Sequence, residues 1–99
     1  MRQFDVCNLL DGRETLVVVL QHDVADELGT RIVAPLSDTP YRRLITDVRV
    51  PLEFEERPYV LQLDRMAAID KRSIGNTRGN VGSEERRIKT ALDLLFLGV

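Results

Sequence analysis

The sequence is poor in residues that build covalent cross-links or reactive centres. Its 99 residues include no tryptophan, one cysteine, Cys7, and one histidine, His22. A lone cysteine can form neither an internal disulfide nor a thiolate metal site, a composition that suits a protein of the reducing cytosol. We therefore expect Cys7 to be a small strand residue, and the sequence indicates no metal and no cofactor.

Long hydrophobic runs and an excess of basic charge are also missing. No apolar stretch approaches the roughly 20 residues of a membrane-spanning helix, and residues 1–5 lack the apolar region of a signal peptide. The formal net charge of −2 offers no basic footprint for unassisted nucleic-acid binding. The expectation is one domain over residues 1–99, cytoplasmic and without a membrane partner.

Alternating apolar residues and frequent turn signals predict a mainly β protein. Strands are expected at residues 4–7, 15–20, 31–36, 48–50 and 59–63. The β-branched run in residues 15–20 predicts a central strand buried on both faces, and in so small a protein a second subunit could cover one of them. This strand is the first indication of a dimer.

Several segments between the strands have compositions typical of connections. Asp11-Gly12 marks a turn, and Glu55–Pro58 has the composition of a polar hairpin loop. The glycine- and asparagine-rich stretch of residues 74–82 predicts a mobile loop, whereas Met66–Ile69 fits either a short strand or a helical turn. Ser83 is the expected N-cap of a C-terminal helix.

The last nine residues, 91–99, form an apolar helix end that one helix face cannot bury. At a helical step of about 100° per residue, one broad stripe collects Ile88, Ala91, Leu92, Leu95, Phe96 and Val99. The opposite side carries Arg86, Thr90, Asp93 and Leu97. Either this is a core helix with a frayed tip, or the excess apolar side chains form a docking surface for a partner.

Three segments of the sequence resemble the CcdB family of plasmid and chromosomal toxins. They are residues 21–26 (QHDVAD), 31–36 (RIVAPL) and 88–99 (IKTALDLLFLGV). The corresponding family patterns are approximately Q-x-D-I-I-D, R-x-V-I-P-L and I-K-x-A-[IL]-[ND]-x-M-[FL]-W-G-I. The first two segments match without a gap between them, whereas residues 37–59 differ in length and match poorly.

The resemblance implies an SH3-like β-barrel of the CcdB/Kid/MazF type with a long C-terminal helix. It also implies a homodimer whose terminal helices lie near the two-fold axis. Proteins of this family bind the A subunit of DNA gyrase and trap the enzyme on cleaved DNA, without catalysis of their own. A CcdA-like antitoxin neutralises them, and the two together repress their own operon, with the antitoxin reading the operator DNA. Such modules serve in plasmid maintenance.

The gyrase-contact positions of the family fall here on seven residues: Val24, Ala25, Asp93, Phe96, Leu97, Gly98 and Val99. Many family members have tryptophan where this chain has Leu97. Leucine lacks the broad ring that stacks on a guanidinium group, a contact worth about 0.5–2 kcal/mol. The resemblance therefore implies gyrase binding of reduced strength.

Two other functions stay open. The related Kid and MazF proteins are endoribonucleases, and a site of that kind could draw on His22, Asp23, Arg31, Asp70 and Arg72. No diagnostic spacing joins these residues, and a lone histidine is more often solvated or structurally bonded. The second alternative is a non-toxic subunit that binds an antitoxin and adjusts repression.

Overall fold

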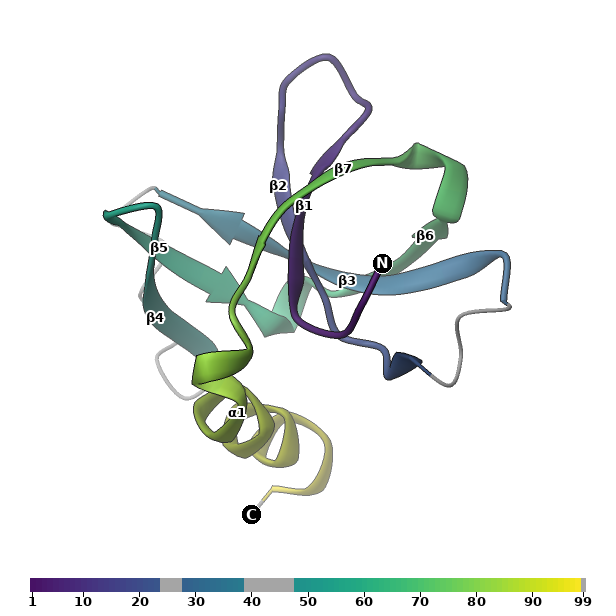
Figure 1. The fold of residues 1–99 in the computed structure, drawn as a ribbon. Coiled ribbons are helices and arrows are strands. Elements are labelled where there is room, and N and C mark those ends of the chain that lie inside the picture. The colour runs from purple at the N-terminus through teal and green to yellow at the C-terminus, as the bar shows by residue number, and fades with distance from the viewer. Residues whose placement is uncertain (24–27, 39–47, 99) are drawn as a thin grey trace.

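The computed structural model describes residues 1–23, 28–38 and 48–98, and Figure 1 shows their arrangement. The strands are β1 Asp5–Leu9, β2 Leu16–Val19, β3 Thr30–Ser37, β4 Arg49–Phe54, β5 Arg57–Gln62, β6 Ala67–Asp70 and β7 Ile74–Asn80. They precede the helix α1, Glu85–Leu97, and three short 3-10 turns connect the later elements: η3 Leu63–Arg65, η4 Lys71–Ser73 and η5 Gly82–Glu84. The prediction of a mainly β fold with a C-terminal helix is confirmed.

One antiparallel sheet contains all the strands, in the order β4-β5-β3-β2-β1-β7, with β6 also paired to β3. The long strand β3 organises the sheet, because β2 lies along one of its edges while β6 and β5 share the other. Figure 1 shows the sheet curling around its own interior, with α1 across one end. This is the curved, helix-capped sheet that the sequence predicts.

The barrel is not closed by hydrogen bonds. Its edge strands are β4 and β7, and among the described residues no ladder joins them. Side chains bridge the two edges instead. Arg78 of β7 forms an ion pair with Glu55, and a Cβ added to Gly79 would lie only 2.7 Å from a ring carbon of Phe54. The Phe54 ring therefore closes onto the bare backbone of Gly79.

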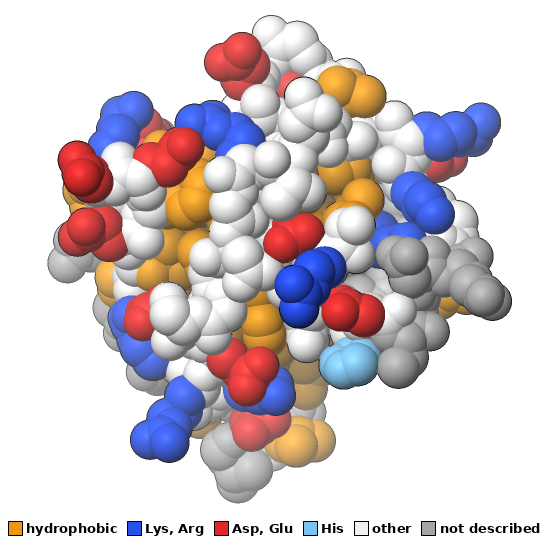
Figure 2. All heavy atoms as spheres, viewed as in Figure 1, with side chains coloured by type: hydrophobic (Ala, Val, Ile, Leu, Met, Phe, Trp, Pro, Cys, Tyr) orange, Lys and Arg blue, Asp and Glu red, His pale blue; other side chains and the backbone are white. Residues whose placement is uncertain are grey.

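The connection between β4 and β5 is the polar hairpin that the sequence predicts. Glu55 and Glu56 have φ values of 51° and 64°, the left-handed conformation of a two-residue type I′ turn. Pro51 and Pro58 lie within these strands, and an edge strand such as β4 tolerates the missing N–H of Pro51. Figure 2 shows acidic and basic side chains interspersed over this face of the molecule.

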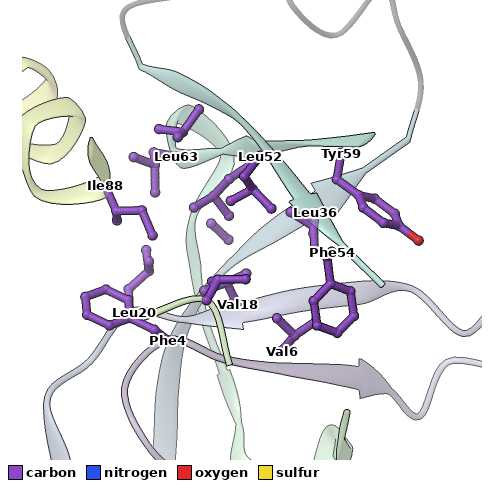
Figure 3. Close-up of a cluster of buried hydrophobic side chains, with 14 of the residues drawn as sticks. Phe4, Val6, Val18, Leu20, Leu36, Leu52, Phe54, Tyr59, Leu63 and Ile88 are labelled. Atoms are coloured by element: carbon purple, nitrogen blue, oxygen red, sulfur yellow. The ribbon is translucent and has the colours of Figure 1, made fainter. Parts of the chain in front are cut away.

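Two layers of apolar side chains pack on opposite faces of the sheet. The larger cluster lies inside the barrel and includes Val6, Val18, Leu61 and Ile88; Figure 3 shows many of its members. The smaller cluster comprises Cys7, Val17, Val19, Val33 and Ile74. Burial raises the pKa of the Cys7 thiol, and its Sγ lies 3.6 Å from Thr77 Oγ1. Cys7 is thus a small buried strand residue, as predicted.

The burial of β2 does not require a second subunit, contrary to the inference from its β-branched run. Strand β2 is buried on both faces, as predicted, but a single copy of the chain covers it completely. Val17 and Val19 pack in the smaller cluster and Val18 in the larger one. The double burial of β2 therefore gives no support to a second subunit.

The prediction of a mobile loop over residues 74–82 is wrong, because most of this stretch is β7. The strand pairs with β1 through an irregular register. Its glycines serve close packing: a Cβ on Gly75 would lie 3.1 Å from the carbonyl oxygen of Asn8, and Gly79 lies against Phe54. The composition that resembles a loop therefore reflects an edge strand pressed against its neighbours.

The start of the helix also differs from the prediction. Ser83 lies inside the η5 turn, and α1 begins at Glu85 without a side-chain cap. Asn80 instead stabilises the approach to η5, since its Oδ1 accepts a hydrogen bond from the Gly82 backbone N–H at 2.7 Å. Within the first turns of α1, Glu85 and Lys89 form an i,i+4 ion pair with 3.5 Å between Oε2 and Nζ.

The segment Met66–Ile69, which the sequence left open between a strand and a helical turn, contains most of β6. This strand pairs with the first half of β3, from Thr30 to Val33. In the part of the chain that the structure describes, no helix combines the length and apolarity needed to cross a membrane.

Candidate interaction surface

Helix α1 is anchored to the barrel only by its first half. Ile88 and Ala91 are buried, and Figure 3 shows Ile88 pointing into the core toward Leu20 and Leu63. Leu92 is partly buried against the same cluster. The buried stripe of the helix therefore ends near Leu92, whereas the apolar stripe predicted from the sequence continues through Leu95 and Phe96 to Val99.

Beyond that point the helix carries four consecutive apolar side chains at the surface, which we call the apolar end. They are Leu94, Leu95, Phe96 and Leu97, with exposed fractions of 38, 36, 67 and 71%. Burying a leucine or phenylalanine side chain contributes about 1.5–3 kcal/mol, so leaving several exposed forgoes considerable stability. A contiguous patch of this kind is typical of a protein-binding surface rather than of a frayed core helix.

A shallow groove of about 210 Å³ runs beside the apolar end. Its lining residues come from β3, α1 and two connections: Leu20, Gln21, Ile32, Met66, Leu92 and Phe96. Ile32 of β3 is itself 39% exposed. The groove extends the apolar end onto the barrel, and the combined surface brings together residues more than 70 positions apart in sequence.

The helix end has a defined geometry. Gly98 adopts φ 75°, the left-handed conformation that glycine accommodates without a Cβ clash. Its N–H donates to the carbonyl oxygens of Asp93 at 3.1 Å and Leu94 at 3.2 Å. This glycine cap ends the helix at Leu97 and holds its last turn in a defined conformation.

The structure brings together part of the predicted contact set. Asp93, Phe96, Leu97 and Gly98 all lie on the last turns of α1 and are exposed. Val24, Ala25 and Val99 lie outside the described residues. The predicted contact positions did not include the neighbours that complete the surface, namely Leu20, Gln21, Ile32, Met66, Leu94 and Leu95.

The residues proposed for ribonuclease chemistry serve separate structural roles. His22 and Asp23 are exposed after β2, and Asp23 accepts a hydrogen bond from the Gln3 backbone N–H. Arg31 is buried, and its guanidinium group donates to the backbone carbonyls of Leu28 and Thr30. Asp70 and Arg72 form a bidentate pair of 3.2 and 2.9 Å on η4.

This pairing limits what Asp70 can do chemically. Hydrogen bonds from the Arg72 side chain and from its backbone N–H lower the pKa of Asp70 to about 2. Such a carboxylate is a poor general base at neutral pH, because its conjugate acid is too strong. Among the described residues, no three or more histidine, cysteine, aspartate or glutamate side chains are grouped for a metal ion.

A second, more polar groove of about 430 Å³ lies away from the apolar end. Its basic lining residues are Arg13 of the β1–β2 connection, Arg65 of η3 and Arg78 of β7. Glu14 and Asp38 line it as well, and Arg78 pairs with Glu55. The groove thus mixes both charge signs, and no sequence motif could indicate it because its residues are scattered along the chain.

The fold has well-defined relatives among solved structures. Mycobacterium tuberculosis toxin MazF-mt6 superposes with a TM-score of 0.78 at 21% identity, over 93% of this chain and 95% of that one. An endoribonuclease in complex with its cognate antitoxin from a mycobacterial species superposes with a TM-score of 0.80 at 14% identity, over 100% and 96% of the two chains. At these identities the likeness establishes the fold alone.

The sequence comparisons are more specific. No curated protein matches the chain in sequence. The family model described as CcdB protein, however, matches residues 3–98, which confirms the resemblance seen in the sequence motifs. The chain therefore belongs to the CcdB family of toxins from toxin–antitoxin systems.

Proposed function

We propose that this protein binds the A subunit of DNA gyrase through the apolar end of α1 and traps gyrase on cleaved DNA. The observation that carries the proposal is the run from Leu94 to Leu97, which stays exposed beyond the last buried turn of the helix. Membership of the CcdB family supplies the identity of the target. In this account the toxin acts by binding and performs no catalysis.

The chemistry of the surface suits such a partner. Phe96 and Leu97 offer large apolar contacts, while Asp93, on the same turns, offers a carboxylate to a basic group of the partner. The Gly98 cap fixes the turn before binding, which reduces the entropy lost on association. Leu97 provides no aromatic face, so the affinity is expected to fall below that of family members with tryptophan.

Two further partners follow from the same proposal. A CcdA-like antitoxin neutralises the toxin and joins it in repressing the operon, with DNA contacts made by the antitoxin. A solved relative in complex with its cognate antitoxin supports such a partner. A homodimer would present the apolar end twice, and two linked contacts raise the effective affinity.

Induced expression in living cells tests the target. The protein is produced in one strain with normal gyrase and in one with a poison-resistant gyrase A subunit. Growth arrest is expected in the first strain only, and it should disappear when the chain ends at Leu95. Arrest in both strains, or arrest that survives the truncation, contradicts gyrase poisoning.

A matched pair of substitutions separates the apolar end from general surface effects. Leu97→Asp places a charge on the proposed contact, whereas Leu10→Asp places one on an equally exposed leucine near the β1–β2 connection; the two side chains are 71 and 69% exposed. Only Leu97→Asp should abolish arrest. Equal loss in both variants would point to a nonspecific effect of surface charge.

A specific observation favours one alternative, an endoribonuclease of the MazF type. The groove that contains Arg13, Arg65 and Arg78 could hold an RNA phosphate, and solved relatives are endoribonucleases. Purified protein incubated with single-stranded RNA decides this question. Cleavage that persists in Leu97→Asp but is lost in Arg65→Ala would support the alternative. Antitoxin binding without growth arrest or RNA cleavage would favour the non-toxic subunit that binds an antitoxin and adjusts repression.

A further inference from the structure

Arg31 occupies a position on β3 that the strand pattern reserves for an apolar side chain. It shares a face of the strand with Val33, which packs in the smaller apolar cluster, and only 2% of its surface is exposed. Burial of a guanidinium group is costly unless its donors find acceptors. An arginine in this position therefore calls for an explanation beyond packing.

The guanidinium group of Arg31 donates hydrogen bonds to backbone carbonyls at the start of β3. Its Nη1 donates to the carbonyl oxygen of Leu28 at 2.6 Å and to that of Thr30 at 2.8 Å. Charge-assisted hydrogen bonds of this kind are stronger than those between neutral groups. The buried Arg31 side chain thus holds the backbone at the start of β3 in place.

The same backbone is held from its other sides. The Gly29 carbonyl oxygen accepts a hydrogen bond from the Lys71 N–H at 2.9 Å, and the Gln21 side-chain oxygen accepts one from the Ile32 N–H at 3.1 Å. Leu20 N–H donates to the Ile32 carbonyl at 2.9 Å. Residues on both sides of the β2–β3 connection are therefore fixed relative to each other.

This fixed backbone borders the groove beside the apolar end. Leu20 and Gln21 before the connection and Ile32 after it line the groove together with Phe96 of α1. Leu28, whose carbonyl accepts from Arg31, is itself an exposed apolar residue. Any loosening at the start of β3 would alter the barrel side of the interaction surface while leaving α1 in place.

We propose that Arg31 is a positioning residue for partner binding, which holds the start of β3 so that Ile32 completes the surface begun by Phe96. It contacts no partner itself. The proposal rests on the proposed function in one respect, the choice of gyrase A as the partner. Its structural half, the local ordering of the β3 start, can be tested without any partner.

The test compares Arg31→Met, which keeps the length and removes every donor, with Arg31→Lys, which can still donate to one carbonyl. Arg72→Met is the matched control, because Arg72 lies on η4 next to the same region but is exposed and forms its ion pair with Asp70 rather than with the start of β3. Amide hydrogen exchange is measured peptide by peptide, and binding to purified gyrase A subunit is measured for each variant.

For Arg31→Met, exchange at residues 28–32 should rise by about tenfold while exchange in β1 and β5 stays unchanged. Gyrase A binding should weaken by about tenfold, since the surface must be ordered on association. Arg31→Lys should fall between Arg31→Met and the original protein. Arg72→Met should change neither the amide exchange at residues 28–32 nor the binding to gyrase A.

Other outcomes overturn the proposal in distinguishable ways. Exchange that rises equally throughout the sheet would make Arg31 a contributor to global stability only. Local loosening without weaker gyrase A binding would remove its link to the partner. If Arg31→Met fails to fold, the same criteria apply to Arg31→Lys. A failure of the unmodified protein to bind gyrase A would refute the proposed function, while the exchange result would still decide the local role of Arg31.

Discussion

At the scale of single residues, the most consequential one is Leu97, which is the most exposed member of the apolar end. A leucine here keeps the patch apolar but removes the aromatic face that many family members present. Position and chemistry are separate properties of this site. The helix exposes residue 97, and under the proposed function its side chain sets how strongly the surface binds a cationic group of the partner.

Leu97→Trp should therefore strengthen binding to gyrase A. A stacked guanidinium contributes about 0.5–2 kcal/mol, which corresponds to roughly a two- to thirty-fold lower dissociation constant. Titration of the purified gyrase A subunit measures this change, and Leu10→Trp controls for added surface area. A dissociation constant that is unchanged or higher would mean that residue 97 does not face a cation in the complex.

Gly79 is decisive for the closure of the barrel, because any Cβ would meet the Phe54 ring at 2.7 Å. Gly79→Ala should lower the free energy of unfolding by about 1–3 kcal/mol through overpacking. Urea denaturation measures the loss. Gly29→Ala is the control, since no atom lies within 4 Å of a Cβ there. Equal stability of both variants would show that the ring moves aside freely.

At the scale of elements, the sequence predicted those whose periodicity and turn chemistry agree. Strand β2, the β4–β5 hairpin and the body of α1 have unambiguous patterns, and all three are present. Strand β7 could not be predicted, because its glycines are needed for close packing against residues such as Phe54 that are distant in sequence. The extent of helix burial was hidden for the same reason, since the barrel under α1 ends near Leu92.

The turn η4 gives a pH-dependent prediction. Asp70 accepts hydrogen bonds from the backbone and side chain of Arg72, which hold the pKa of its carboxyl at about 2 in the folded protein. The unfolded value is near 3.9. Because the folded pKa is the lower one, the stabilising contribution is present above pH 4 and is lost as the pH falls toward 2.

The difference in stability between the original protein and Asp70→Asn should accordingly be constant from pH 7 to 5 and shrink between pH 4 and 2. Thermal unfolding across this range measures it, and an NMR titration of the Asp70 carboxyl measures the pKa directly. A stability difference that does not change on acidification would show that the Arg72 contacts do not persist in solution.

At the scale of the whole molecule, the two halves of α1 differ in burial, and the proposed function assigns recognition to the exposed half. The first half completes the core through Ile88 and Ala91, and the second half projects the apolar end beside a groove that the barrel lines. The motifs in the sequence predicted four of the described residues at this helix end as contact residues: Asp93, Phe96, Leu97 and Gly98. They could not identify the barrel residues of the groove, because only folding brings β3 and Met66 next to Phe96.

This division predicts that function can be removed without unfolding. Leu97→Asp changes a mostly exposed side chain, so the free energy of unfolding should change by less than about 0.5 kcal/mol. Chemical denaturation measures this quantity. A loss of several kcal/mol would mean that residue 97 is covered in solution by another part of the protein or by a second copy.

The most direct test of the central claim is equilibrium binding of purified gyrase A subunit to the folded protein and to its Leu97→Asp variant, with Leu10→Asp as the control. Binding by the original protein and by Leu10→Asp, weakened at least about thirtyfold in Leu97→Asp, is the predicted result for a central contact. Absence of gyrase A binding by the original protein, or equal binding by all three proteins, would show that the apolar end of α1 does not bind the gyrase A subunit.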